Sequence, residues 1–73
     1  MAKEIVEVPI TGKIISVEVK VGDAVNEGDT ICTIESMKME NPIQAPVSGK
    51  ITELKVAPGQ TASTGNIIAV IEY

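Results

Sequence analysis

The stretch PITGKIISVEVKVGDAVNEGDTICTIES, residues Pro9–Ser36, recurs without a gap 37 positions later as PVSGKITELKVAPGQTASTGNIIAVIEY, residues Pro46–Tyr73. Ten of the 28 aligned pairs are identical, and all six glycines fall into matched pairs, Gly12/Gly49, Gly22/Gly59 and Gly28/Gly65. Glycine is favoured where the backbone turns sharply or takes a positive φ, so both halves are predicted to make the same three turns. Two such halves predict a pseudo-two-fold unit in which each half buries the apolar face of the other.

The composition of the whole chain favours strands over helices. Its 73 residues include eleven isoleucines and nine valines but a single leucine, Leu54. β-Branched side chains lose rotamer freedom in helices and fit a pleated sheet, and the spread of six glycines and four prolines leaves no room for a long helix. At this length we expect one domain, spanning residues 1–73, with an accessible surface of about 4,300 Å².

The apolar segments that lie between the glycine and proline residues predict seven or eight short strands. They cover Lys3–Pro9, Gly12–Val19, Ala24–Val25, Thr30–Ser36, Met39–Ala45, Gly49–Val56, Thr61–Ala62 and Ile67–Glu72. In the second, Ile15, Val17 and Val19 are expected to share one face, because side chains alternate at period two. Pro42 cannot donate to a ladder and is expected at a sheet edge or bulge. The predicted fold is all-β, a pseudo-two-fold flattened β-barrel or sandwich of two antiparallel sheets.

Several function classes do not suit this composition. The chain has no histidine, one cysteine and one aromatic residue, Tyr73, so neither a catalytic nor a metal site is expected. The net charge of −4 disfavours nucleic acid, and the longest apolar run, Ile67–Ile71, is too short to cross a bilayer. Cys32, whose repeat mate is Ala69, is expected to be a small buried core residue. A lone cysteine without a signal pattern favours a cytoplasmic setting.

The junction of the two halves holds the hairpin Ser36–Met39. Because Ser36 overlays Tyr73 and Lys38 overlays Met1, this hairpin is the symmetry mate of the gap between the chain ends. We therefore expect the termini to lie near each other at one pole of the domain and Lys38 to be exposed at the opposite pole.

The tip of this hairpin places two methionines around one lysine. A single lysine is most often a solvated surface charge, and paired methionines usually fill a core. At a turn that faces solvent, flexible apolar side chains beside a charge instead indicate a recognition surface. Lys38, Met37 and Met39 are therefore the candidate functional residues. For Glu35, a role in turn geometry and a scaffold role shared with its repeat mate Glu72 both stay open.

The segment Met37-Lys38-Met39, preceded by Glu35-Ser36 and followed by Glu40, closely resembles the biotin-attachment motif of biotinyl domains. These are the biotin carboxyl carriers of biotin-dependent carboxylases and decarboxylases. The resemblance covers essentially the whole chain, including the paired Gly-Lys-Ile segments and the glycine turns. The common family form has alanine where Ser36 stands. The resemblance implies a barrel-sandwich hybrid fold, biotin attached covalently to Lys38, and a role for Met37 and Met39 in recognition by partner enzymes.

The resemblance also implies partners and a reaction. A lysine amine is almost wholly protonated at neutral pH, so the domain is not expected to acylate itself. The implied partners are a biotin protein ligase, a biotin carboxylase and a carboxyltransferase, between which carboxybiotin on a non-catalytic carrier shuttles CO₂. The implied final acceptor is an acyl-CoA or a 2-oxo acid. Val19 runs directly to Gly22, whereas carriers of bacterial acetyl-CoA carboxylase have an insertion at this point, so the insertion-free carriers are favoured.

Two other functional interpretations of the sequence remain open. A lipoyl carrier shares the fold and the hairpin lysine but usually has aspartate where Met37 stands, and a domain that accepts both groups is a related alternative. The other is an unmodified barrel-sandwich module of the kind found in membrane-fusion adaptors. Those modules lack the Met-Lys-Met turn and are usually split by a long helical hairpin.

Overall fold

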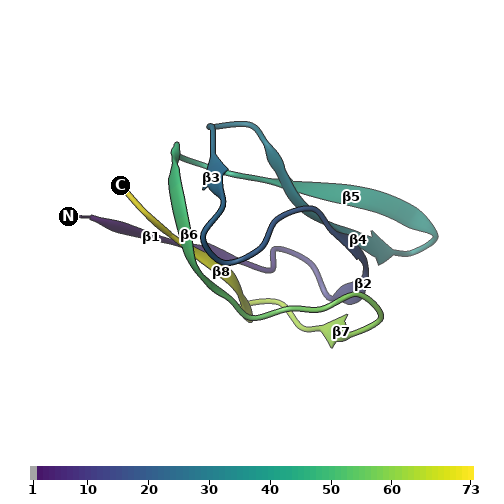
Figure 1. The fold of residues 1–73 in the computed structure, drawn as a ribbon. Coiled ribbons are helices and arrows are strands. Elements are labelled where there is room, and N and C mark those ends of the chain that lie inside the picture. Colours follow the sequence, from purple (N-terminus) through teal and green to yellow (C-terminus); the bar gives the residue numbers. More distant parts are fainter. Residues whose placement is uncertain (1) are drawn as a thin grey trace.

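The computed structural model describes residues 2–73, which form eight strands. In chain order they are β1 (Lys3–Glu7), β2 (Gly12–Val17), β3 (Ala24–Val25), β4 (Thr30–Ser36), β5 (Met39–Gln44), β6 (Gly49–Leu54), β7 (Thr61–Ala62) and β8 (Ile67–Glu72). They build two antiparallel four-stranded sheets with the orders β1-β8-β6-β3 and β5-β4-β2-β7 (Figure 1). The predicted all-β sandwich is confirmed, and no helix in residues 2–73 could span a membrane.

The two halves of the chain interlock through both sheets. Moving 37 residues along the chain converts β1, β2, β3 and β4 into β5, β6, β7 and β8, and so converts one sheet order into the other. Backbone hydrogen bonds between the halves repeat with the same operation. Ile51 N donates to Asp23 O and Gly22 N to Ile51 O, both at 2.8 Å, while Ile14 N donates to Gln60 O at 2.8 Å and Gly59 N to Ile14 O at 2.7 Å. The repeat is therefore a pseudo-two-fold axis of the fold.

The core consists mainly of isoleucines that the repeat duplicates. The pairs Ile14/Ile51, Ile31/Ile68 and Ile34/Ile71 are all 0% exposed and include the largest fully buried side chains. Full burial of such a side chain contributes about 1.5–3 kcal/mol. Cys32 and Ala69 are also fully buried, which confirms the core position predicted for the cysteine. The accessible surface of 4311 Å² agrees with the area expected for this length.

Gly12 and Gly49 permit a close approach between neighbouring strands. A Cβ on Gly12 would collide with the carbonyl oxygen of Glu35 and lie 2.7 Å from Ile34 Cγ2. A Cβ on Gly49 would meet the matching atoms of Glu72 and Ile71 in the same way. These contacts explain why the two halves share both the glycine and the segment that it packs against.

Strand β2 departs from the predicted alternation at Ile15. Ile14 is fully buried, whereas Ile15 is 36% exposed, so the prediction that Ile15 shares the inner face with Val17 is wrong. The reason is a β-bulge: the pairing of β2 with β4 shifts between Ile14 and Ser16, and the extra residue reverses the phase of the side chains. After the bulge, Val17 packs against the core as expected.

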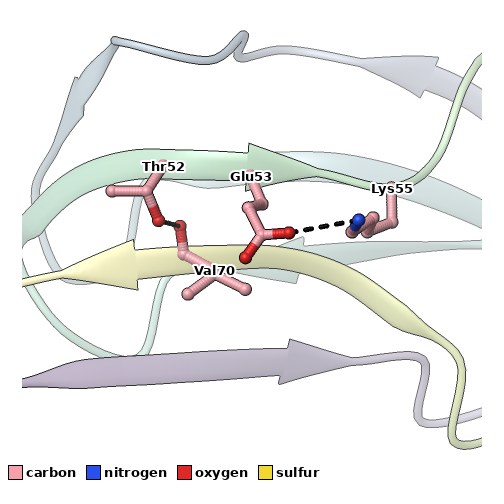
Figure 2. A network of polar contacts seen from close by, with 4 residues as sticks. All are labelled: Thr52, Glu53, Lys55 and Val70. Atoms are coloured by element: carbon pink, nitrogen blue, oxygen red, sulfur yellow. Dashed lines mark hydrogen bonds and ion pairs between the residues drawn. The ribbon is translucent and has the colours of Figure 1, made fainter.

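The matching bulge in β6 lies at Thr52, opposite β8. The pairing shifts between Ile51 and Glu53, and the Thr52 hydroxyl donates to the carbonyl oxygen of Val70 at 3.3 Å (Figure 2). Beside it, Lys55 Nζ and Glu53 Oε1 lie 3.1 Å apart. Both side chains are about half exposed, so this ion pair contributes no more than about 1 kcal/mol. The repeat thus extends to the irregularities of the strands.

Four strands end earlier than predicted. β1 ends at Glu7 instead of Pro9, β2 at Val17 instead of Val19, β5 at Gln44 instead of Ala45, and β6 at Leu54 instead of Val56. Beyond β1 and β5 the backbone bonds to turns: Val8 N donates to Asn66 O and Ala45 N to Asp29 O, each at 2.8 Å. β2 and β6 each pair for two more residues beyond the bulge, and just past their ends Glu18 N donates to Ile31 O at 2.7 Å and Lys55 N to Ile68 O at 2.8 Å.

Replacing Gly49 by alanine is expected to lower the free energy of unfolding by about 1–3 kcal/mol, because the added methyl group overpacks the β6–β8 contact. Gly12→Ala should lower the free energy of unfolding by a similar amount, since the two glycines have matching neighbours. Urea denaturation measures both effects. Lys50→Ala, at the exposed next position, is the control and should change stability by less than about 0.5 kcal/mol. An unchanged stability for Gly49→Ala would contradict the packing described here.

Burial raises the pKa of the Cys32 thiol to about 11, from an ordinary value of 9.0. The unfolded thiol therefore ionises at a lower pH than the folded one, and folded stability should fall as pH rises between these values, by about 2–3 kcal/mol. Urea unfolding of the wild type and of Cys32→Ala across this pH range measures the effect. The variant has no thiol, so its stability should lack this part of the pH dependence. The native thiol should also resist a disulfide reagent at pH 8 and react once the chain is unfolded. Rapid reaction of the folded protein would refute the burial.

Candidate functional site

The β4–β5 hairpin and the chain ends lie at opposite poles of an elongated domain. The extents along the principal axes are 37 × 18 × 16 Å, and the two ends lie together on the left of Figure 1, with the β4–β5 turn on the right. Ala2 N donates to Tyr73 O at 2.8 Å, and Tyr73 N donates to Ala2 O at 2.9 Å. This confirms that the termini lie near each other and away from the hairpin. Met1 lies outside the described residues.

The turn at the tip of the hairpin has an unusual backbone for its sequence. Ser36 pairs with Met39, and the two residues between them have positive φ angles, 53° at Met37 and 64° at Lys38. Two positive φ angles define a type I′ turn, which normally has Asn-Gly at these positions. Methionine and lysine are strained there by about 1–2 kcal/mol each, so the paired strands must impose the turn.

All three predicted site residues lie together on this turn and project into solvent. Met37 is 87% exposed and Met39 is 66% exposed, and Lys38 is also exposed. The amine of Lys38 makes no hydrogen bond or ion pair with the rest of residues 2–73, whereas Lys55 pairs with a carboxylate. The turn therefore offers a free primary amine between two exposed thioether side chains.

Asn41 supports the hairpin just behind the turn, a contact that the sequence did not reveal. Its amide Nδ2 donates to the carbonyl oxygen of Met39 at 3.3 Å and lies 3.5 Å from that of Ile34. The partners are backbone atoms brought close by the hairpin register, so no residue pattern pointed to them. The next residue, Pro42, lies on β5 at the edge of its sheet, as predicted.

The outer face of the hairpin carries two carboxylates in register. Glu35 pairs directly with Glu40, and Lys13 of β2 pairs with Glu35 on the other side. All three side chains are exposed, and none of them forms an ion pair within residues 2–73. The Glu35 side chain makes no hydrogen bond or ion pair within residues 2–73, and the part of Glu35 that lies against Gly12 is its backbone carbonyl.

A pseudo-two-fold sandwich that presents one free lysine on a hairpin opposite its termini is the architecture of a carrier domain. Comparison with protein families agrees, because the family described as "Biotin-requiring enzyme" matches residues 4–71. The chain belongs to this biotin and lipoyl attachment family, and it is a biotin carrier domain.

Individual relatives are parts of larger enzymes. The gamma subunit of methylmalonyl-CoA decarboxylase from Veillonella parvula is 50% identical over 40 residues, covering 55% of this chain and 31% of that protein. The alpha chain of propionyl-CoA carboxylase from Ruegeria pomeroyi is 58% identical over 33 residues, covering 45% of this chain and 5% of that protein. Among solved structures, the urea carboxylase of Kluyveromyces lactis matches 99% of this chain and 6% of its own, with a TM-score of 0.89 and 32% identity. This chain thus spans only a small part of the proteins that it matches.

Replacing the two turn residues by the preferred pair, Met37→Asn with Lys38→Gly, is expected to raise the free energy of unfolding by about 1–2 kcal/mol. The physical reason is that asparagine and glycine adopt positive φ with little strain. Urea denaturation measures the gain. Met39→Asn is the control, since Met39 is in extended backbone and its replacement should give no increase. A turn variant no more stable than the wild type would show that the turn is not strained.

Proposed function

We propose that Lys38 is the biotin acceptor of this domain and that the biotinylated domain carries CO₂ between a biotin carboxylase site and a carboxyltransferase site. The observation that carries the proposal is the free, exposed amine of Lys38 at the tip of the hairpin, in a chain of the biotin-requiring family. No side chain of the described residues covers the amine or bonds to it, so the turn fits a covalently attached group.

Attachment forms an amide bond between Lys38 Nζ and the carboxyl carbon of biotin. A lysine amine is normally protonated at neutral pH, and it has to lose a proton before it attacks the carboxyl carbon. The described residues offer no base in contact with Lys38, so the proposal assigns proton removal and activation of the carboxyl group to a biotin protein ligase. The amide carries no charge, and the net charge of the chain changes from −4 to −5.

Met37 and Met39 are proposed to be the apolar contacts of the turn with the ligase and with the carboxylase. Their exposed thioethers lie on either side of the acceptor and take no part in the core cluster. When bound, biotin supplies the ring nitrogen that carries CO₂, and the domain determines where the attached biotin is placed. Its elongated body holds the tip far from the chain ends, so a tethered carrier meets its partner sites at a high effective concentration.

The domain is proposed to be a carrier without catalytic activity of its own, and the enzymes of the reaction belong to other domains or subunits. Methylmalonyl-CoA decarboxylase, propionyl-CoA carboxylase and 2-oxoglutarate carboxylase are among the relatives. These names support an acyl-CoA or a 2-oxo acid as the final substrate of the whole enzyme. We further propose that the domain works in the cytoplasm, where a free thiol such as that of Cys32 stays reduced.

Lys38→Arg is expected to abolish labelling by a biotin protein ligase with ATP and biotin while leaving the fold intact, because arginine keeps the charge and cannot form the amide. Intact-mass and peptide mass spectrometry measure the gain and its position. Lys13→Arg, on the neighbouring strand β2, is the matched control and should be labelled like the wild type.

Three outcomes would reject the assignment: no labelling of the wild type, labelling of another lysine, or continued labelling of Lys38→Arg. A parallel incubation with a lipoate ligase separates the two carrier classes. Exclusive lipoylation of Lys38 would replace biotin by lipoate in the proposal.

A further inference from the structure

The sulfur atoms of residues 2–73 lie in two contrasting environments. Cys32 is 0% exposed in the core, and burial raises the pKa of its thiol, so that the reactive thiolate is scarce. Met37 and Met39 are 87% and 66% exposed at the tip of the hairpin. An oxidant in solution therefore reaches the two thioethers that flank Lys38 and does not reach the thiol.

Oxidation of these methionines would alter the turn without loosening the fold. Neither side chain belongs to the core cluster, and the hairpin is held by the pairing of β4 with β5 and by the amide of Asn41. A sulfoxide is polar and chiral, whereas a thioether is flexible and apolar. The change is therefore confined to the surface that a partner enzyme contacts around the acceptor.

We propose that Met37 and Met39 form a reversible oxidation site that lowers the acceptor activity of Lys38. The inference rests on the proposed function of Lys38 and adds a modification of its neighbours. A peroxide transfers one oxygen atom to each sulfur: the O–O bond breaks, an S–O bond forms, the sulfur loses two electrons and the peroxide is reduced to water. The sulfoxides are substrates of the class of methionine sulfoxide reductases, which restore the thioethers.

The experiment treats the whole chain with hydrogen peroxide, removes the peroxide with catalase, and then measures the rate of biotin attachment by a biotin protein ligase. Peptide mass spectrometry should find one added oxygen on Met37 and one on Met39, with Cys32 unmodified. The attachment rate should fall by about five- to tenfold, as expected for the loss of an apolar contact. Incubation with methionine sulfoxide reductases A and B should restore the rate, while the urea midpoint stays unchanged throughout.

The double variant Met37→Leu/Met39→Leu is the matched control, because it keeps Met1 and Cys32 but has no thioether in the turn. For each protein the ratio of the rates after and before peroxide is compared, so the basal rate of the variant does not matter. The ratio should stay near one for the variant. If the variant is too poor an acceptor to measure, the recovery of the oxidised wild type after incubation with the reductases still tests the inference.

An unchanged rate in the fully oxidised wild type would overturn the inference, and so would an equal fall in the double variant or a failure of the reductases to restore the rate. Labelling of the untreated chain at Lys38 separates these outcomes from a failure of the proposed function, which would leave the untreated chain unlabelled.

Discussion

Each half of this chain lacks a partner for its own apolar face, and the mutual burial of the two halves is the constraint on which the structure depends. The three isoleucine pairs of the core come from the repeat, and all six side chains are fully buried in one cluster to which both halves contribute. β3 of the first half pairs with β6 of the second, and β7 of the second half pairs with β2 of the first. Beside these pairs, the backbone groups of Ile14 and Ile51 form reciprocal hydrogen bonds with the other half. Because apolar burial dominates the stability of so small a domain, neither half is expected to fold alone.

The two equivalent poles differ in the charges that face each other across the paired strands. At the terminal pole Lys3 pairs with Glu72, opposite charges in register, whereas at the hairpin Glu35 pairs with Glu40, like charges in register. Opposed like charges destabilise a strand pair, and the left-handed turn adds strain. Neither feature stabilises the hairpin, and violations of this kind are typical of functional sites, in keeping with the role proposed for the tip.

The repeat allowed much of the fold to be predicted from the sequence. The matched glycines and apolar residues are local features, and they were enough to predict seven or eight strands, a two-fold core, a buried Cys32 and adjoining chain ends. The exposure of Ile15 was not predictable, because a bulge depends on which residue of the neighbouring strand lies opposite. Likewise, the strand ends are set by turns that are distant in sequence, such as that of Asn66 beyond Val8.

For the candidate site, the position of the turn in the fold was predictable and its backbone conformation was not. The repeat placed Lys38 opposite the termini, and the flanking methionines marked the turn as a surface. Its positive φ angles were not apparent, since Met-Lys is not a sequence that favours a type I′ turn. The hydrogen bond from Asn41 to the Met39 carbonyl was not predictable for a related reason, because side-chain bonds to backbone depend on register rather than on residue type.

The mutual hydrogen bonds of Ala2 and Tyr73 occupy the place that Met39 and Ser36 hold in the other half. A covalent link is therefore needed at only one of these two equivalent places, and the topology is compatible with an origin by gene duplication from a homodimer of half-length chains. In such an ancestor both ends of the particle would have been open. Fusion of two such genes would close one end with a short loop, and in this chain that loop carries Lys38.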